Sequence, residues 1–356
     1  MSDDAAARDP FAAIAAEPPS LTAEDAVAIA RDQYGLSASA SPLVSERDQN
    51  FLLDACGARS ILKIANAAED PLVTTFQIEA LLHVAKQQVV GLAVPAILPT
   101  VDGQSHLRIE HDGASHIVRL VSYLPGELLG ERAPSSQTAR DLGRWLARRD
   151  QALSDFRHPG ERPDLLWDMK RASHLRQLLP HVADEKHREL IDSTISEFEI
   201  DALPLFERIP WQVIHNDANP ANILVDGEAV AGLIDFGDML YSPRIIELGV
   251  AGAYLRRLEG NPLALIVEML HGYHGESRLG RDEVNVLHTL IKTRLATTVA
   301  ILYWRASLRA ADDAYLAAAL ESEGSAVVFL ERLAAIPSAN AAQIYSQVCA
   351  SAQVEL

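Results

Sequence analysis

Few cysteines, few basic residues and no long apolar run exclude several classes of protein for this chain of 356 residues. Cys56 and Cys349 are too few for a disulfide framework and show no metal-binding spacing, which fits a reducing, cytoplasmic location. No apolar stretch reaches the ~18–20 residues that a membrane-spanning helix needs. The first residues also lack the basic and then apolar pattern of a signal peptide.

Basic residues are in the minority, with 31 Lys and Arg against 49 Asp and Glu, and the formal net charge is −18. Nucleic acids and anionic membranes both bind basic surfaces, so we expect neither as a partner. Acidity that serves only solubility is the simpler explanation of this composition, although it also suits a cationic substrate. The sequence does not indicate an oligomeric state.

Composition and patterning divide the chain into four predicted segments. Residues 1–20 are rich in Ala, Asp and Pro and predict a flexible leader. Residues 21–121 predict a β-rich N-terminal lobe, 122–126 a hinge, and 127–356 a larger, mainly helical C-terminal lobe. The predicted fold class is therefore α+β with two lobes, an arrangement that commonly binds ligands between its lobes.

The N-terminal lobe is predicted to begin with a helix from Thr22 to Tyr34, capped by Thr22 and Asp25 and ended by Gly35. An antiparallel sheet of about five strands follows over residues 42–124, with one helix inserted after the third strand. Three glycine-containing turns, Cys56-Gly57, Asp102-Gly103 and Asp112-Gly113, are predicted to form hairpins.

The C-terminal lobe is predicted to be helical apart from short apolar strands within residues 211–235. Hydrophobic residues at helical spacing predict one helix that Ser135 or Ser136 caps and that continues to about Leu153. Further helices are predicted over residues 164–180, 184–200, 245–258, 262–275, 281–311 and 313–335.

The most informative segment is VIHNDANPANILVDGEAVAGLIDFGD at residues 213–238. His215 and Asp217 are followed by Asn222 and then by the Asp-Phe-Gly triplet that begins at Asp235. The spacing H-x-D-x-x-x-x-N followed by D-F-G is typical of the catalytic and metal-binding loops of kinases. The H-x-D motif alone and the D-F-G triplet alone are each weak evidence, and the alternative interpretation is an acidic loop beside a hairpin without a catalytic role. The combined pattern favours a kinase.

Phosphoryl transfer explains why these residue types occur at this spacing. A carboxylate must orient the attacking hydroxyl and accept its proton, and Asp217 is the candidate. Mg²⁺ prefers oxygen ligands, which Asn222 and Asp235 supply. A hairpin that turns at Asp226-Gly227 is expected to bring these two ligands to one site. His215 is expected to orient the loop by hydrogen bonding.

Upstream, Lys63 lies in the third predicted strand, where kinases place the lysine that holds the nucleotide phosphates. Glu79 lies in the predicted helix after it, where kinases place the glutamate that pairs with this lysine. An exposed lysine and a surface glutamate are the plain alternative for each residue alone. Together with the downstream motif they predict a nucleotide-binding pair.

Two features of protein kinases are missing. No glycine-rich G-x-G-x-x-G loop precedes Lys63, and its place is taken by VSERDQNFLL. Ser45 and Gln49 in this segment are candidates to contact phosphate, and exposure to solvent is the equally good alternative. Helical sequence resumes within about ten residues of Asp235, so there is no long segment on which a polypeptide substrate could dock. This short connection predicts a small-molecule substrate.

These motifs resemble those of the aminoglycoside phosphotransferase and choline kinase-like family. HNDANPANILV, GLIDFGD, ILKIAN, FQIEALL and VSYLPGE match its pattern in order between about residues 42 and 258. SERDQNFLL and IDFGDMLYSPRIIELGVA are most similar to the hydroxylysine kinase-like branch. Many members carry Gly at Asn216, and the family's Asp-Leu-Ala after the metal-binding loop is replaced by Glu-Leu-Gly at Glu247.

The resemblance implies a two-lobed, protein-kinase-like fold that uses Mg²⁺ and ATP or GTP. It implies that the hinge binds the nucleobase through the backbone of Ser122 and Leu124. It also implies a hydroxyl acceptor that is a cationic amino alcohol, with 5-hydroxylysine as the first candidate. An aminoglycoside, homoserine, choline or ethanolamine kinase is an alternative, and a nucleotide-binding pseudokinase without turnover is a second one.

Overall fold

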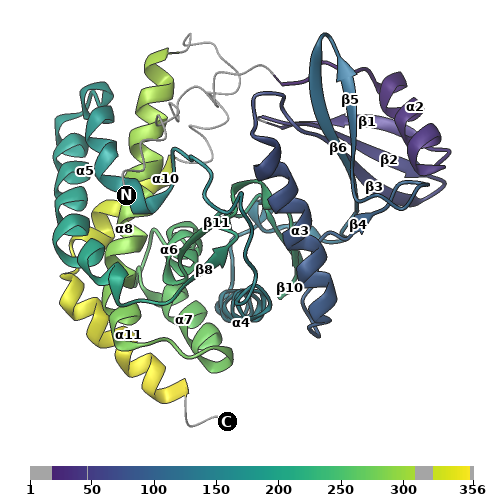
Figure 1. The fold of residues 1–356 in the computed structure, drawn as a ribbon. Coiled ribbons are helices and arrows are strands. Elements are labelled where there is room, and N and C mark those ends of the chain that lie inside the picture. The colour runs from purple at the N-terminus through teal and green to yellow at the C-terminus, as the bar shows by residue number, and fades with distance from the viewer. Residues whose placement is uncertain (1–17, 46, 309–323, 353–356) are drawn as a thin grey trace. The chain divides into compact units, whose positions relative to one another are not determined.

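The computed structural model describes residues 18–45, 47–308 and 324–352 of the chain (Figure 1). The predicted leader and much of the helix predicted over 313–335 lie outside these residues. The chain forms two compact units. Unit 1 comprises the residues up to Pro125 together with 156–166 and 232–237, and unit 2 comprises the rest.

Unit 1 opens with helix α2 (Ala23–Tyr34), whose two ends are those expected from the sequence. The Thr22 hydroxyl accepts a hydrogen bond from the Asp25 amide at 3.1 Å, and the Asp25 carboxylate accepts one from the Thr22 amide at 2.9 Å. This reciprocal capping box satisfies two amides that the first turn leaves unpaired. Gly35 ends the helix in the left-handed conformation, at φ 66°.

The sheet of unit 1 is antiparallel and has six strands rather than about five. Helix α3 (Pro71–Gln87) follows the third strand, as predicted. The strand order is β1-β2-β3-β6-β4, and β5 also pairs with β6. The strands are β1 (Ser39–Leu43), β2 (Gln49–Ala55), β3 (Ala58–Ile64), β4 (Ile97–Leu98), β5 (Leu107–His111) and β6 (Ala114–Ser122).

Two of the three predicted turns in unit 1 join paired strands. Cys56-Gly57 joins β2 to β3, and Asp112-Gly113 joins β5 to β6, with all four residues at positive φ. Asp102-Gly103 was predicted to form a hairpin and does not. It turns the chain between β4 and β5, which both pair with β6 instead of with each other.

The core of unit 1 lies between α2 and one face of the sheet. Helix α2 lies beside the strands β1 and β2 (Figure 1). Ala26, Ala30 and Tyr34 of α2 pack with buried strand residues that include Phe51 and Leu62. Alternate strand residues such as Phe51 and Leu53 share this face because strand side chains alternate between the two faces of a sheet.

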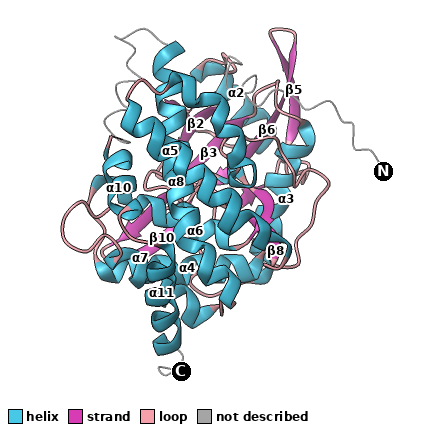
Figure 2. Cartoon of the chain, turned by 90° about the vertical axis from the view of Figure 1, so that its left-hand side faces the viewer, coloured by secondary structure: helices cyan, strands magenta, loops and turns pink. Residues whose placement is uncertain are grey.

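Helices make up most of unit 2 (Figure 2). The segment from Met169 to His181, which was predicted to be α-helical, forms 3₁₀ turns that are interrupted at Arg171 and contain Pro180. Helix α11 was not predicted. The helices are α4 (Ser136–Ala152), α5 (Glu185–Glu197), α6 (Ile245–Tyr254), α7 (Ala264–Glu276), α8 (Arg281–Leu308), α10 (Ser325–Ala334) and α11 (Ser338–Ala352). None of the helices in the described ranges is both long and apolar enough to cross a bilayer.

Short strands carry the kinase-like motif, as predicted. A small antiparallel pair joins β8 (Trp211–Ile214) to β11 (Leu240–Pro243). The hairpin predicted at Asp226-Gly227 is present between β9 (Ile223–Asp226) and β10 (Ala229–Leu233), with Gly227 at φ 58°. The strand β7 (Glu127–Leu128) pairs with β9.

Glycines bring α4 and α7 into close contact. A Cβ atom on Gly143 of α4 would lie 1.9 Å from the Met269 carbonyl oxygen, and one on Gly272 of α7 would lie 1.9 Å from the Arg140 carbonyl oxygen. Both distances are far shorter than any real carbon–oxygen contact, so the two helix backbones can approach this closely only because both positions lack a side chain.

We expect Gly272→Ala to destabilise unit 2 by roughly 1–3 kcal/mol or more, because the new methyl group must push α4 and α7 apart. Gly275→Ala, in the same helix but with open space around its Cβ position, is the matched control. It should be neutral or stabilising by up to about 1 kcal/mol, since Ala favours a helix over Gly. Urea unfolding of both variants checks this, and equal midpoints would contradict it.

Candidate active site

The segment after β8, which the sequence predicts to be the catalytic loop, is anchored through Asn216. This residue is fully buried and adopts the left-handed conformation, at φ 66°, which Asn tolerates better than most residues. The same backbone geometry explains why Gly is common here in the family that this chain resembles. The Asn216 amide donates to the Glu247 carboxylate at 3.0 Å, and its side chain donates to the Asp238 carbonyl at 3.3 Å.

Glu247 belongs to a fully buried group of charges in unit 2. Its carboxylate lies 3.0 Å from the Arg149 guanidinium, which also contacts Asp150 at 2.6 Å. Asp150 in turn accepts a hydrogen bond from the Tyr273 hydroxyl at 2.7 Å. Because buried charges need partners, Arg149 is what allows two carboxylates to lie behind the catalytic loop.

The two carboxylates have opposite pKa shifts. Burial raises the pKa of Asp150 to about 6, and Glu247 adds to this effect while Arg149 opposes it. Burial also acts against ionisation of Glu247, but its neighbours, Arg149 above all, hold its pKa below the usual value. Glu247 is therefore the charged partner that can accept the hydrogen bond from the Asn216 amide.

His215 is fully buried at the start of the catalytic loop, and its Nδ1 accepts a hydrogen bond from the Asp217 amide at 3.2 Å. This contact joins the histidine to the residue predicted to be the base. It is the kind of contact expected of a residue that orients the loop rather than one that moves protons.

The Asp217 carboxylate is held by two asparagines from its own loop. Asn219 Nδ2 donates to it at 3.0 Å and Asn222 Nδ2 at 2.7 Å. The guanidinium of Arg294, from α8, lies 3.6 Å from Asp217 Oδ1. These contacts fix the direction of the carboxylate.

Asn222 can hold Asp217 and bind a metal ion at the same time. Its Nδ2 donates both to the Asp217 carboxylate and to the Asp217 carbonyl. The amide oxygen is left without a hydrogen bond to the described residues, and oxygen is the donor that Mg²⁺ prefers. Within unit 2 the structure therefore brings two of the predicted residues, Asp217 and Asn222, together.

Unit 1 brings two other predicted residues together. Lys63 Nζ lies 3.6 Å from Asp235 Oδ1. Asp235 follows β10 with φ 57°, and its carboxylate accepts a hydrogen bond from the Gly237 amide at 3.3 Å. Half of the Asp235 side chain is exposed to solvent.

The predicted pairing of Glu79 with Lys63 is wrong for this structure. Glu79 lies on α3, as expected, but its mostly exposed carboxylate is 3.6 Å from His158 Nε2, and no ion pair with Lys63 occurs among the described residues. The buried face of α3 carries Gln77 instead. Residues two apart on a helix do not face the same side, so a buried Gln77 turns Glu79 outward.

Gln77 is the α3 residue that reaches the Asp-Phe-Gly segment. Its side chain donates to the Gly237 carbonyl at 3.2 Å and accepts from Arg119 at 2.8 Å. Sequence reasoning missed it, although a signal exists. Gln77 follows the helical spacing of the buried Ala80, Leu81 and Val84, whereas Glu79 does not.

Ser122 and Leu124 lie where the resemblance places the hinge, at the end of β6 and just beyond it. The Ser122 amide is occupied by the Ala96 carbonyl at 2.8 Å, and its hydroxyl accepts from the Ala96 amide at 2.9 Å. The Leu124 backbone makes no hydrogen bond with the part of the chain that the structure describes. Leu124 is therefore the better placed of the two to bind a nucleobase.

Gln49 has a structural role instead of the phosphate contact that was one reading of the sequence. Its side chain accepts a hydrogen bond from the Leu21 amide at 2.9 Å and donates to the Leu21 carbonyl at 2.7 Å. These two bonds tie β2 to the start of α2 and leave the side-chain amide committed to the backbone.

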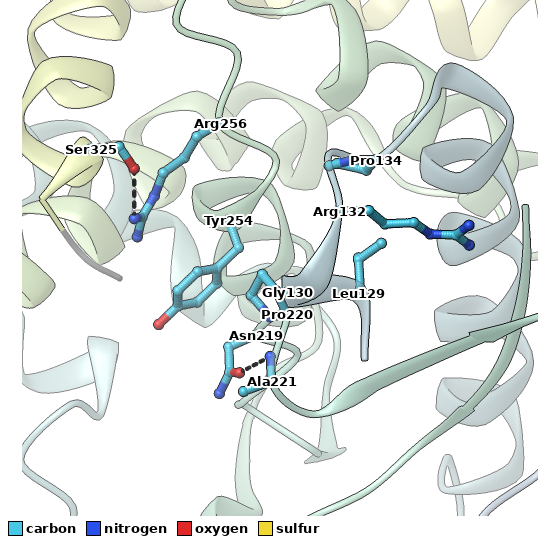
Figure 3. Close-up of a pocket in the computed structure, with 10 residues that line it drawn as sticks. All are labelled: Leu129, Gly130, Arg132, Pro134, Asn219, Pro220, Ala221, Tyr254, Arg256 and Ser325. Carbon is cyan, nitrogen blue, oxygen red and sulfur yellow. Dashed lines mark hydrogen bonds between the residues drawn. The ribbon is translucent and has the colours of Figure 1, made fainter. Parts of the chain in front are cut away.

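A pocket of about 320 Å³ borders the catalytic loop within unit 2 (Figure 3). One wall is the loop itself, where the Pro220 carbonyl accepts a hydrogen bond from the Gly130 amide at 3.0 Å. Tyr254, the last residue of α6, and Arg256, two residues beyond it, form another wall. The lining residues are Leu129, Gly130, Arg132, Pro134, Asn219, Pro220, Ala221, Tyr254, Arg256 and Ser325.

The fold resembles that of solved small-molecule kinases at low sequence identity. Amicoumacin kinase, determined with AMP-PNP, Ca²⁺ and amicoumacin, aligns over 86% of this chain and 93% of its own, with a TM-score of 0.66 and 13% identity. A microcompartment-associated aminopropanol kinase aligns over 92% and 98%, with a TM-score of 0.59 and 17% identity. The expected two-lobed, kinase-like fold is thus confirmed.

The proteins that are similar in sequence are also named as small-molecule kinases. Hydroxylysine kinase from Mus musculus is 26% identical over 326 residues, covering 84% of this chain and 86% of its own. Homoserine kinase from Rhizobium meliloti (strain 1021) is 28% identical over 255 residues, covering 69% and 72%. The model of the phosphotransferase enzyme family matches residues 39–284. This match spans the sheet of unit 1, the catalytic loop and the Asp-Phe-Gly segment, and the chain belongs to the phosphotransferase enzyme family.

Proposed function

We propose that this protein is a small-molecule kinase that transfers the γ-phosphoryl group of ATP or GTP to the hydroxyl of a cationic amino alcohol. The observation that carries the proposal is the Asp217 carboxylate, which Asn219 and Asn222 hold in one direction on a loop anchored to a buried charge. A base fixed in this way suits the in-line attack of a bound hydroxyl.

In the proposed reaction, the acceptor hydroxyl donates a hydrogen bond to Asp217. The hydroxyl oxygen forms a bond to the γ-phosphorus while the bond from that phosphorus to the β–γ bridging oxygen breaks. Asp217 takes the hydroxyl proton, and the nucleoside diphosphate leaves with the bridging oxygen. Arg294, 3.6 Å from Asp217 Oδ1, places a positive charge beside the carboxylate before attack.

Lys63 has the proposed role of binding the nucleotide phosphates. Its Nζ lies 3.6 Å from the Asp235 carboxylate in the same unit, so a cation and a metal ligand lie side by side. We assign this role to Lys63 without the help of Glu79, whose carboxylate is near His158. In unit 1, the Leu124 backbone is proposed to bind the nucleobase.

Mg²⁺ fits the donors that Asn222 and Asp235 offer, an amide oxygen and a half-exposed carboxylate. No cluster of three or more His, Cys, Asp or Glu side chains suited to a metal ion occurs among the described residues. Mg²⁺ is usually held by one or two side chains together with substrate phosphates. When bound, Mg²⁺ would neutralise charge on the transferring phosphates.

The first candidate for the acceptor is 5-hydroxylysine. Several relatives named hydroxylysine kinase match over about five-sixths of this chain, and the relatives named homoserine kinase match over shorter parts. The net charge of −18 favours the approach of cations. Homoserine, choline, ethanolamine and aminoglycosides are the alternative acceptors, and a pseudokinase without turnover is the alternative to an enzyme.

We expect Asp217→Asn to lower kcat by roughly 10²–10⁴-fold, because the amide cannot accept the hydroxyl proton. The KM for the nucleotide should change little. Asp226→Asn, at the exposed turn between β9 and β10, is the matched control and should behave as wild type. Steady-state kinetics check this, and near wild-type turnover of Asp217→Asn would remove Asp217 from the proposed role.

Asp235→Asn should abolish turnover and weaken nucleotide binding only when Mg²⁺ is present, since it removes a charged ligand of the metal ion. Asn222→Ala should raise the Mg²⁺ concentration needed for half-maximal rate. Calorimetric titration of nucleotide with and without Mg²⁺ measures both effects. Activity that survives an excess of chelator would show that the proposed metal role is wrong.

The acceptor is tested by comparing kcat/KM for hydroxylysine, ethanolamine, choline, homoserine and kanamycin, with ATP and GTP in separate series. We expect hydroxylysine to give the highest value, because the relatives named hydroxylysine kinase match over more of this chain than those named homoserine kinase. A preference for a neutral or anionic alcohol would overturn the cationic acceptor while leaving a kinase. Transfer to none of a wide panel would favour the pseudokinase.

A further inference from the structure

The face of the sheet in unit 1 that packs against α3 carries two cations side by side. Ile117 of β6 packs with Ile78 of α3, and Arg119, two residues further along β6, shares the face of Ile117. Lys63 of β3 is the direct partner of Arg119 in the antiparallel register, so both cations leave the sheet on this face. Like charges opposite one another are destabilising, so each cation needs a partner of its own.

The two cations have different partners. Lys63 Nζ lies 3.6 Å from the Asp235 carboxylate. Arg119 is buried, and its Nη2 lies 3.6 Å from the Asp48 carboxylate and donates a hydrogen bond to Gln77 Oε1 at 2.8 Å. Helix α3 therefore contributes a neutral amide to this group of charges, and that amide contacts Arg119.

Arg119 determines which way the Gln77 amide points. A guanidinium only donates hydrogen bonds, so the atom of Gln77 that faces it must be the oxygen. The Nε2 group is then directed at the Gly237 carbonyl, to which it donates at 3.2 Å. Gln77 is only 2% exposed, and a buried amide that lost either bond would leave a polar group without a partner.

Gly237 connects Gln77 to the proposed metal ligand. Its carbonyl accepts the hydrogen bond from Gln77, and its amide donates to Asp235 Oδ1 at 3.3 Å. Asp235 has φ 57°, an uncommon backbone conformation that persists where the surrounding structure holds it. The two bonds of Gly237 therefore help to hold the segment in the conformation that presents the Asp235 carboxylate.

We infer that Gln77 is a positioning residue for the proposed metal site. Held by Arg119, it fixes the Asp-Phe-Gly segment so that Asp235 can bind the metal ion. The inference rests on the proposed function, in which Asp235 is a metal ligand, and it gives α3 a role that does not depend on Glu79. An ionised carboxylate at position 77 could still bind Arg119, but it could not donate to the Gly237 carbonyl.

The test measures binding rather than turnover. Mn²⁺ is the probe for the metal site, and electron paramagnetic resonance follows free Mn²⁺ during titration with AMP-PNP. Calorimetry measures the affinity for AMP-PNP with Mn²⁺ and with chelator. We expect Gln77→Glu to weaken Mn²⁺-dependent binding by roughly 5–50-fold, the range for a buried carbonyl that loses its donor. Binding without metal should stay close to wild type, whereas a general folding defect would weaken both.

Three variants control for charge, for the helix and for the choice of residue. Gln77→Met removes both bonds without adding charge and should weaken metal-dependent binding as Gln77→Glu does. Gln87→Glu makes the same change at an exposed position of α3 and should behave as wild type. Glu79→Gln should also keep wild-type binding, whereas a nucleotide-binding pair of Lys63 and Glu79 would make it a weak binder. Urea unfolding checks that each variant is folded.

Arg119 is tested through Gln77. Arg119→Met alone should weaken metal-dependent binding, because the Gln77 amide can then turn over. In the Gln77→Met background the same substitution should add little further loss, since residues that act through one contact are not additive. Fully additive losses would show that Arg119 does not act through Gln77.

The outcomes separate this inference from the proposed function. Metal-dependent binding that is unchanged in Gln77→Glu and Gln77→Met overturns the inference, even if wild type phosphorylates hydroxylysine. A loss that is equal with and without Mn²⁺ also overturns it. Metal-dependent binding that is weakened in both variants supports it, even if no acceptor is phosphorylated. A wild type that binds AMP-PNP equally with and without Mn²⁺ contradicts both the inference and the metal role of Asp235.

Discussion

One hydrogen bond, from the Asn216 amide to the buried Glu247 carboxylate, anchors the loop on which the proposed chemistry depends. The amide points at Glu247 because Asn216 adopts the left-handed backbone conformation. Glu247 is charged there because Arg149 lies 3.0 Å away, equally buried. Removing one partner of such a buried pair typically costs about 3–5 kcal/mol, because the other charge is left uncompensated. The loop is thus coupled to the core of unit 2.

The hydrogen bond from Asn216 to Glu247 also explains how Glu247 can replace the Asp that the aminoglycoside phosphotransferase-like family has at this position. The carboxylate still accepts the loop amide, and Arg149 balances its charge. Gly249 lies two positions later. If this residue had a Cβ atom, that atom would lie only 3.0 Å from the Leu290 side chain, so glycine allows α6 to pack closely against α8. The Glu-Leu-Gly sequence at this place is therefore compatible with a working loop.

Local features were predictable from the sequence. The capping box at Thr22, the left-handed Gly35 and the hairpins at Cys56-Gly57, Asp112-Gly113 and Asp226-Gly227 each depend on a few adjacent residues, and all are present. The kinase-like motif spacing identified the segment that carries Asp217 and Asn222, whose side chains are in contact.

Contacts between distant segments were not predictable. Arg149 contacts Glu247, and Arg294 lies near Asp217. Both contacts depend on how the helices that carry the arginines pack in unit 2, and no local sequence pattern predicts that packing. The expected partner of Lys63 was wrong because the rotation of α3 about its own axis decides which residue faces the site. The hairpin predicted at Asp102-Gly103 was wrong because a turn motif does not determine which strands pair, and β4 and β5 both pair with β6.

Phosphorus NMR of the complete reaction mixture tests the central claim most directly. The protein is incubated with ATP, Mg²⁺ and hydroxylysine, and the products are followed by their phosphorus signals. The account predicts ADP and a phosphate monoester of the acceptor in equal amounts, with coupling that places the phosphorus on the hydroxyl oxygen. Formation of ADP with inorganic phosphate alone, or a phosphorus–nitrogen product, would contradict it.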